Sequence, residues 1–600
     1  MCVFVDFTVR VRGAVLGLWP VAPSGRALDL SSVLVEAPRE PCHGDLSTNA
    51  AMVLAEPLLL EPLYIADKIA AVLMKDNDLT SVSVAGPGFI NMTLSSTYFA
   101  QLIVEILSAG KDYGRCAPQN VKINIESVSA NPTGPLHLGH CRGAVFADAL
   151  ANLLEFVGYD VTREYYINDA GIQVKFLLES AYLRYLEALG EEVEIHSGLY
   201  SGDYLKPIGE SLVAKFGSSL KSMSCEEWTG LIEQIVIDEI MLIIREDLLN
   251  LGVKHDVFFS ERALQSGAEG DRVADVIGKL SLNGDVYQGR LPPPKGAKQL
   301  SDLEDRDQVI FRSTAYGDDV DRSLIKADGS YTYFASDVAY HYDKYLRGFT
   351  RQVDVLGADH GGYVKRLCAA VKAVSGGEAI LDVKICQLVK LLIDGKPFKM
   401  SKRFGNFVTC RELLSEVGLD AIRFMMLFRK NDTPMDFDLH KVVEQSRDNP
   451  VFYVQYAYAR SMSVLRQFAE FECDIGTATE LAHPEEIYEA IPEKLLVNTD
   501  YVILIDSGEI SLIRRLMEWP KVVQTAGQAG EPHRIATYLH RLASDFHVHW
   551  NRGRTHGELR FVIANDRNIT MARLGLVSSV AIVLSNGLRI LGVSAPASMR

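Results

Sequence analysis

The 600-residue sequence predicts three successive parts: an α+β module, a central α/β domain on an open parallel sheet, and an all-helical C-terminal domain. Between about residues 118 and 430, strand-like stretches alternate with helix-like ones, which is the pattern of an α/β domain. Beyond about residue 430 the strand signals fade and apolar residues recur at helical spacing. Several domains are expected at this length, because single cores rarely exceed about 250–300 residues.

Composition indicates an ordinary globular protein, with 48% hydrophobic and 23% charged residues. The net charge of −16 gives no support to a basic nucleic-acid-binding surface, although a local basic strip remains compatible with it. The nine cysteines form no CxxC pair, which argues against a zinc site and against a disulfide framework. We therefore expect a reducing cytoplasm and no metal held by protein side chains.

Neither apolar run near the termini predicts a membrane segment. The run at 14–20 is short and Asp6 precedes it, which is unlike a signal peptide. The run at 574–591 is interrupted by Ser578, Asn586 and Arg589, which predicts a buried amphipathic helix.

The N-terminal module is expected to cover residues 1–117. Segments 46–55 and 65–73 have helical spacing, and residues 82–84 before a Gly-Pro-Gly turn read as a strand. Cys42 and His43, just ahead of the first predicted helix, are interpreted as a turn and cap rather than a catalytic pair.

The central domain is expected to cover residues 118–430, with a mostly helical insertion at about 190–255 that carries the stretch YSGDYLKP. The helical domain is expected to cover residues 431–600.

The stretch ANPTGPLHLGH, residues 130–140, lies where a predicted strand passes into a predicted helix. An open α/β sheet presents ligands at such a point. His137 and His140 are three residues apart at the helix start, so both rings can face one way, and Gly139 lets a ligand approach the backbone. The helix N-terminus favours an anion. The stretch therefore predicts a phosphate site, with two solvated or capping histidines as the alternative.

A second basic stretch follows an apolar run that ends in a tight Asp-Gly turn. It contains Lys399, Met400, Ser401 and Lys402, and a capping box from Thr409 starts the next helix. Lysines on such a loop can neutralise charge that develops on a departing pyrophosphate. Without the first motif, a solvated basic loop would explain it as well.

HLGH followed by KMSK resembles the paired signatures of class I aminoacyl-tRNA synthetases. The resemblance covers nearly the whole chain and narrows to the arginyl-tRNA synthetases, through the stretches ESVSANPTGPLHLGHCRG, YYINDAGIQV, YSGDYL, YTYFASDVAYHYDKY, GADHGGYV, FKMSKRFGNFVT, DNPVFYVQYAYAR, EPHRIATYL and LGVSAPASM. It implies a Rossmann-type catalytic domain, an N-terminal domain that contacts the tRNA elbow (here HGDLSTNAA) and a helical anticodon-binding domain. It also implies ATP-dependent formation of arginyl-adenylate and its transfer to tRNA(Arg).

By this resemblance the ATP site comprises two groups of residues. The catalytic group is His137, His140, Lys399 and Lys402; Gly139, Asp359, His360, Met400 and Ser401 complete the site. Asp359 and His360 follow a second short strand, and no third candidate ligand nearby makes them a metal site. Mg²⁺ is expected to arrive on the ATP phosphates, and no zinc is expected.

Arginine requires carboxylates that can meet a planar, permanently charged guanidinium. Glu126 ends the strand before the first motif, and Tyr333 and Asp337 share one helical face. The resemblance assigns these three residues and Asn131 to arginine binding. A solvated strand end for Glu126 and a helix-dipole charge for Asp337 are the alternatives.

The helical domain offers aromatic and basic side chains suited to single-stranded RNA. The candidates are Tyr453, Tyr456, Tyr458, Arg460, Trp550 and Met599. Helical spacing cannot turn all three tyrosines outward, so at least one is expected in the core. The expected partners are tRNA(Arg), arginine and ATP, with no membrane, and the chain is expected to be a monomer.

Three other functions fit parts of the sequence. They are an inactive synthetase-like protein, a class I synthetase for another amino acid such as lysine, and a nucleotidyltransferase. The intact histidines and lysines disfavour the first, and the arginine-type stretches disfavour the second. The third leaves the flanking domains unexplained.

Overall fold

The structure is a computed structural model that describes residues 2–266, 270–291, 307–397, 408–444, 446, 448–473, 496 and 498–599. The chain forms two compact units. One contains residues 1–116, 446–529 and 534–600; the other contains residues 117–445 and 530–533. Each unit is described by itself.

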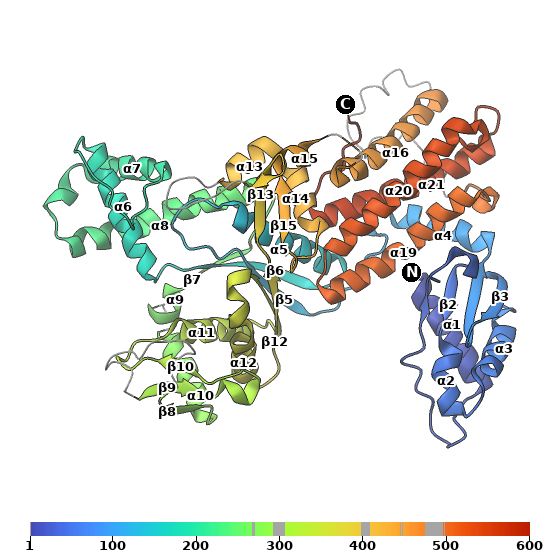
Figure 1. Ribbon diagram of the computed structural model, residues 1–600, viewed down its shortest axis with the longest axis horizontal. Coiled ribbons are helices and arrows are strands. Elements are labelled where there is room, and N and C mark those ends of the chain that lie inside the picture. Colours follow the sequence, from blue (N-terminus) through green and yellow to red (C-terminus); the bar gives the residue numbers. More distant parts are fainter. Residues whose placement is uncertain are drawn as a thin grey trace. The chain divides into compact units, whose positions relative to one another are not determined.

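The N-terminal module is an antiparallel four-stranded sheet covered by helices (Figure 1), with strand order β1-β2-β4-β3. Its elements are α1 Val3–Leu18, β1 Val35–Glu36, β2 Leu46–Thr48, α2 Ala50–Leu58, α3 Pro62–Leu73, β3 Leu79–Ala85, β4 Phe89–Leu94 and α4 Ser96–Ala109. The strand expected at 82–84 is part of β3. The helix expected at 46–55 is wrong at its start, because residues 46–48 pair with β4 and the helix begins only at Ala50.

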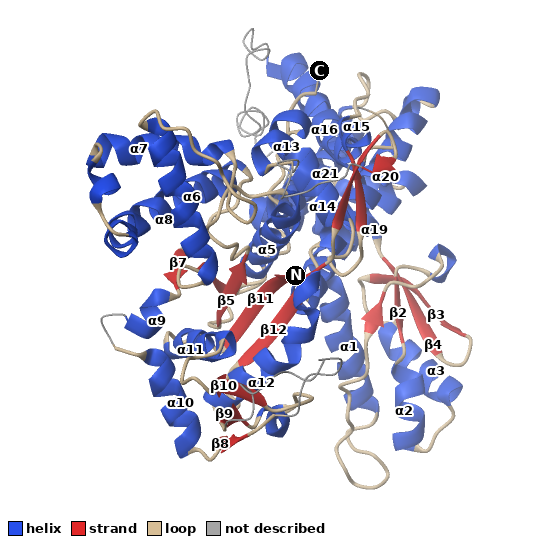
Figure 2. Ribbon diagram, turned by 60° about the vertical axis from the view of Figure 1, so that its left-hand side comes forward, coloured by secondary structure: helices blue, strands red, loops and turns tan. Residues whose placement is uncertain are grey.

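The unit that contains residues 117–445 is organised on a parallel sheet of order β12-β11-β5-β6-β7. Its strands are β5 Lys122–Ser127, β6 Asp160–Ile167, β7 Val257–Ser260, β11 Arg351–Gly357 and β12 Ile380–Cys386. In Figure 2, α5 (Leu138–Phe156) lies on one side of this sheet, with α11 (Tyr333–Leu346) and α12 (Val364–Val374) on the other. The chain leaves β5 toward β6 and leaves β11 toward β12. Strand order therefore reverses between β5 and β11, where sheets of this kind bind ligands.

Further elements of this unit surround the sheet. The predicted insertion is helical and begins earlier than expected, with α6 Ile172–Ala188, α7 Lys206–Phe216 and α8 Cys225–Asn250. The segment between β7 and α11 contains α9 Arg262–Ser266, α10 Arg272–Leu282, β8 Val286–Gly289, β9 Gln308–Phe311 and β10 Arg322–Ile325. After β12 come β13 Val389–Ile393, β14 Lys396–Pro397, α13 Cys410–Val417, α14 Leu419–Phe428, β15 Met435–Asp438 and α15 Leu439–Val443.

The C-terminal part is helical, with α16 Pro450–Cys473, α19 Ser507–Ala529, α20 His533–Thr555 and α21 Arg567–Leu591. Its core packs against the end of the N-terminal module. The Trp519 indole donates to the backbone carbonyl of Tyr113 at 3.0 Å, and the Tyr113 hydroxyl donates to the carbonyl of Leu516 at 3.3 Å. Among the described residues, α21 alone is long and apolar enough to cross a membrane, and 83% of its most apolar stretch is buried inside the protein. This is the burial expected of a core helix.

Candidate active site

The first motif forms the turn from β5 into α5. His137 is the N-cap of α5, and its Nδ1 accepts from the Gly139 backbone N–H at 3.1 Å. His140 Nδ1 in turn accepts from the His137 backbone N–H at 3.4 Å. The two rings stack with centroids 3.8 Å apart. They therefore lie together at the helix N-terminus, as their spacing predicted.

The absence of a side chain at Gly139 leaves room for the His137 ring. A Cβ at Gly139 would lie 3.0 Å from Cε1 of the His137 ring, a contact that needs the ring to shift. The open backbone at this position thus keeps the capping histidine in place.

Other elements hold the motif loop from outside. The Tyr204 hydroxyl, from the predicted insertion, donates to the Thr133 carbonyl at 2.6 Å, and the Tyr165 hydroxyl donates to the Ala130 carbonyl at 2.8 Å. Asp247 of α8 accepts from the Leu136 backbone N–H at 3.0 Å. The YSGDYL stretch is therefore a support for this loop.

The second motif, with Lys399, Met400, Ser401 and Lys402, lies outside the described residues. The residues that follow this motif, from Val408 onward, are described. Thr409 forms a β-bridge with His137, the Val408 carbonyl accepts from the Leu138 N–H at 3.4 Å, and the Cys410 N–H donates to the Leu136 carbonyl at 2.8 Å. Residue 408 is thus anchored beside the first motif, on the same edge of the sheet.

Carboxylates converge at the carboxyl ends of β5, β6 and β7. Burial raises the pKa of the Tyr166 phenol on β6, and four neighbouring negative charges raise it further. These four carboxylates are Glu261, Asp337, Glu126 and Asp169. Asp169 has a structural role, because its carboxylate accepts from the Ser260 hydroxyl at 2.6 Å and from the Arg262 backbone N–H at 3.1 Å.

Two of these carboxyl groups, Glu261 and Asp337, have no ion-pair partner among the described residues, and the pKa of each is raised. Burial raises the pKa of Glu261 to about 7, with Asp337 and Asp169 adding to the shift. Burial also raises the pKa of Asp337 to about 6, although the Tyr363 hydroxyl donates to this carboxylate. Glu261 is 5% exposed, and its Oε2 has no hydrogen-bond partner among the described residues. An acidic site of this kind favours a cationic ligand.

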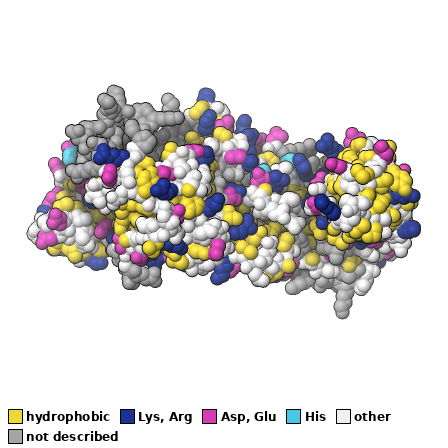
Figure 3. Space-filling model, turned by 90° about the horizontal axis from the view of Figure 1, so that it is seen from below, with side chains coloured by type: hydrophobic (Ala, Val, Ile, Leu, Met, Phe, Trp, Pro, Cys, Tyr) yellow, Lys and Arg dark blue, Asp and Glu magenta, His cyan; other side chains and the backbone are white. Residues whose placement is uncertain are grey.

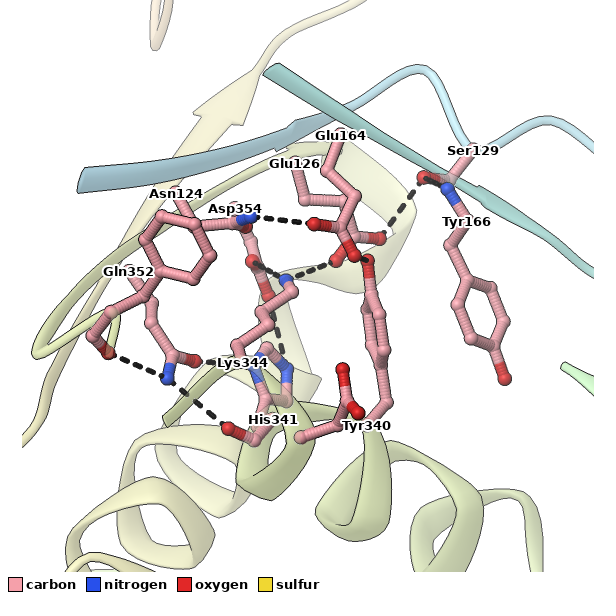
Figure 4. A network of polar contacts seen from close by, with 12 residues as sticks. Asn124, Glu126, Ser129, Glu164, Tyr166, Tyr340, His341, Lys344, Gln352 and Asp354 are labelled. Atoms are coloured by element: carbon pink, nitrogen blue, oxygen red, sulfur yellow. Dashed lines mark hydrogen bonds and ion pairs between the residues drawn. The ribbon is translucent and has the colours of Figure 1, made fainter. Parts of the chain in front are cut away.

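Glu126 is buried and charge-paired, which makes the solvated-strand-end alternative wrong. It is 8% exposed, and its Oε2 accepts from Lys344 Nζ at 2.7 Å (Figure 4). Ser129 donates to Oε1 at 3.0 Å. Burial raises the pKa of Glu126, and the positive charge of Lys344 opposes that shift.

The sheet face under α11 is polar in a regular pattern. Side chains on one face of a strand recur every second residue, and those on one face of a helix recur every three or four. The strands contribute Asn124, Glu126, Glu164, Tyr166, Gln352 and Asp354; the helix contributes Asp337, Tyr340, His341 and Lys344. Glu164 shows how completely this network is paired. It accepts from Asn124 at 2.7 Å, Tyr340 at 2.9 Å and twice from Arg347 at 2.8 Å.

The remaining predicted ligands are more exposed. Tyr333 begins α11 and is 65% exposed, and the phenol bonded to Asp337 is Tyr363 instead. Asn131 is exposed and donates to Gln173 at 2.8 Å. Asp359 and His360 follow β11 in a short 3-10 helix, Ala358–Tyr363, and both are exposed.

Sequence reasoning missed Glu261, Asp247 and Lys344. Glu261 directly follows the short strand β7, whose pairing with β6 brings it to the site. A carboxylate at the end of a strand was the available signal. The strand was not predicted, because it is short and directly follows the helical insertion in sequence. Lys344 was detectable from its helical spacing with Asp337 and His341.

Four of the C-terminal candidates form one cluster on α16 and α20, namely Tyr453, Tyr456, Arg460 and Trp550. The Arg460 guanidinium lies 4.2 Å from the Tyr456 ring centroid and 5.2 Å from that of Trp550. Tyr453 lies against His547, with centroids 4.5 Å apart. Tyr458 is only 2% exposed, which confirms that one of the three tyrosines is in the core. Met599 is half-buried.

One group of possible metal ligands occurs among the described residues, in the N-terminal module. Ligand atoms of Glu40, Cys42 and His43 lie within 4.8 Å of one another, and all three side chains are exposed. On the face shown in Figure 3, described side chains of both charges are interspersed.

A parallel sheet with HLGH at its switch point, and with the chain after KMSK bonded to that loop, defines a class I aminoacyl-tRNA synthetase. Three family models match: the arginyl tRNA synthetase N-terminal domain over residues 18–94, the class I (R) catalytic domain over 102–197, and the DALR anticodon binding domain over 454–599.

Arginine–tRNA ligases of Azorhizobium caulinodans and Rhizobium meliloti are 55% and 53% identical to this chain, each over 100% of both sequences. The chain belongs to the arginine–tRNA ligases, which attach arginine to tRNA in an ATP-dependent reaction through an aminoacyl-adenylate. Arginyl-tRNA synthetase structures from Thermus thermophilus (19% identity, TM-score 0.70, 100% of both chains) and Plasmodium falciparum (14%, 0.68, 100% of this chain and 99% of that one) share its fold.

Proposed function

We propose that the acidic cluster at the ends of β5, β6 and β7 is the arginine subsite of this ligase. Glu261 and Asp337 face the guanidinium, while Glu126, Asn131 and Tyr333 contact the rest of the amino acid. The proposal is supported above all by the buried Glu261 and the half-buried Asp337, two carboxyls whose pKa values are raised beside a charge-paired network. A guanidinium supplies the missing positive charge and up to five N–H donors.

ATP is proposed to bind at the N-terminus of α5. His137, Gly139 and His140 hold the phosphates, with Asp359 and His360 near the ribose. The arginine carboxylate attacks the α-phosphorus in line, an O–P bond forms, and the bond to pyrophosphate breaks. Lys399 and Lys402, with Met400 and Ser401 on the same loop, follow the departing pyrophosphate. This chemistry needs positioning and charge stabilisation rather than a protein nucleophile.

Mg²⁺ is expected on the ATP phosphates, held mainly by substrate oxygens and water. We propose no zinc. Residues 1–117 are proposed to contact the tRNA elbow, residues 118–430 to carry out catalysis, and residues 431–600 to read the anticodon. The enzyme is proposed to act in the cytoplasm as a monomer.

Two tyrosines two residues apart test the anticodon surface. Tyr456 is half-buried beside Arg460, whereas Tyr458 is in the core. Tyr456→Ala is expected to raise KM for tRNA about five- to a hundredfold, as loss of one stacking platform does. KM for arginine and ATP should not change. Tyr458→Phe, the matched control, should leave KM for tRNA unaltered; equal effects of both changes would place the anticodon elsewhere.

Aminoacylation with each amino acid in turn tests the whole assignment, and arginine alone is expected to be transferred to tRNA(Arg). Pyrophosphate exchange in the presence and absence of tRNA tests the family's requirement for bound tRNA before activation. Robust exchange without tRNA would contradict that requirement while leaving the arginine subsite intact. Transfer of lysine in place of arginine would refute the subsite itself.

A further inference from the structure

Lys344 is a fully buried lysine under the proposed arginine subsite. Its side chain is 0% exposed and its Nζ lies 2.7 Å from Glu126 Oε2 and 3.2 Å from Asp354 Oδ1 (Figure 4). The ammonium also lies 4.2 Å from the Tyr340 ring centroid. Burial by itself would lower the pKa of Lys344, but Asp354 and Glu126 raise it, so the side chain stays charged. No step of adenylate formation uses this charge.

Glu126 depends on Lys344 for its charge balance. The other ionisable groups around Glu126 come from three elements, and negative charge predominates among them. They are Asp337, Tyr340 and His341 on α11, Asp354 on β11, and Glu164 and Tyr166 on β6. Glu164 is neutralised by Arg347, and His341 Nε2 lies 3.3 Å from Asp354 Oδ2. Among the described residues, Lys344 is therefore the cation at ion-pair distance from Glu126.

The Glu126 carboxylate is also fixed in direction. Lys344 holds Oε2 from one side, and the Ser129 hydroxyl donates to Oε1 from the other. Ser129 itself sits at φ +39°, and its hydroxyl oxygen accepts from the Tyr166 backbone N–H at 3.1 Å. A carboxylate clamped in this way needs no reorientation when a ligand arrives, which lowers the entropic cost of binding.

We propose that Lys344 is a positioning residue for arginine binding, which holds the Glu126 carboxylate in place beneath the substrate and supplies its counter-charge. The proposal rests on the proposed contact between Glu126 and arginine. Arginine brings a cationic α-amino group as well as its guanidinium, and an anchored, ionised carboxylate suits either. Among the described residues no lysine pairs with Glu261 or Asp337, and these two carboxyls are left to be neutralised by the substrate.

Lys344→Met tests this inference, because methionine preserves most of the volume and removes the charge. The expected result is a rise of about tenfold or more in KM for arginine at pH 7, with KM for ATP unchanged. Without its counter-charge Glu126 takes up a proton, so the arginine KM should recover as the pH is raised to 9. A purely structural loss would not recover with pH.

Lys279→Met is the matched control. Lys279 packs against the same helix, its Nζ lies 4.1 Å from the Tyr342 ring centroid, and it donates to the Tyr342 hydroxyl and the Val374 carbonyl. Neither partner is a carboxylate. This change should leave KM for arginine and its pH dependence as in the unaltered enzyme.

A double-mutant cycle with Glu126→Gln tests the positioning role of Lys344 separately from the proposed contact between Glu126 and arginine. If Lys344 acts through Glu126, the double variant should bind arginine no worse than the weaker-binding single variant. Multiplicative effects would overturn the proposal, as would an unchanged arginine KM in Lys344→Met. No effect of Glu126→Gln would overturn the arginine contact as well. If Lys344→Met does not fold, the double variant supplies the comparison, since it also removes the unpaired Glu126 charge.

Discussion

Asp337→Asn is expected to lower kcat/KM for arginine by about 30- to 1,000-fold, with KM for ATP close to that of the unaltered enzyme. Asp337 is half-buried and its carboxylate accepts from the Tyr363 hydroxyl. Burial and the negative charges of Glu126 and Asp354 raise its pKa, and the positive charge of His341 opposes them. An arginine guanidinium placed there gains a charge-assisted hydrogen bond shielded from water. The amide keeps the shape but loses the charge, so the substrate's own charge is left less well paired.

Asp343→Asn is the matched control for this prediction. Asp343 lies on the same helix and is 9% exposed, but its partners are Arg272 and Arg347. Its replacement is expected to lower the melting temperature and to leave KM for arginine unchanged. Steady-state aminoacylation at varied arginine concentrations distinguishes the two variants. Equal losses in both would mean that Asp337 serves stability rather than substrate binding.

Local signals predicted the strand, loop and helix of the first motif, where ATP phosphates are proposed to bind. The strand, the loop and the helix with His137 at its start lie where the alternation of residues placed them. Such features depend on neighbours in sequence, which periodicity reports. The role of Lys399 and Lys402 at the pyrophosphate stays a prediction. The position of residue 408 beside the first motif supports this role.

The proposed arginine subsite depends on contacts between distant segments, which the sequence pattern does not report. Glu261 reaches the site because β7 pairs with β6 more than 90 residues away, as Glu164 pairs with Val257. The buried Glu126 is charge-paired with Lys344, which comes 218 residues later in the sequence. A strand-end carboxylate on its own gives no sign of whether it faces water or a lysine. The alternation of polar residues on β5, β6 and β11 can be recognised in the sequence. Only the three-dimensional structure shows that these strand faces all pack against α11.

Arginine binding is expected to weaken by about 20-fold between pH 8 and pH 6, because the proposed guanidinium ligands take up protons in that range. Burial places the pKa of Glu261 at about 7 and that of Asp337 at about 6. A guanidinium binds the ionised carboxylates, so affinity rises as pH rises through these values and levels off above about pH 8. Calorimetric titration in buffers of different ionisation enthalpy should also record net proton release near pH 7.

Stability of the unliganded enzyme should change with pH in the opposite direction. Both carboxyls have folded-state pKa values above their unfolded ones. Their contribution to stability is therefore fully present below the unfolded pKa, near 4, and is lost as the pH rises through about 7. Arginine should consequently raise the melting temperature more at pH 8 than at pH 6.

Glu261→Gln separates the two carboxyls, because it removes the group with the higher pKa. Arginine should bind this variant more weakly at pH 8, and the pH dependence that remains should be the lower step, from Asp337. The unliganded variant should also lose less stability between pH 6 and pH 8 than the unaltered enzyme. An arginine dissociation constant that is constant from pH 6 to pH 8 in the unaltered enzyme would show that neither carboxyl meets the substrate's charge.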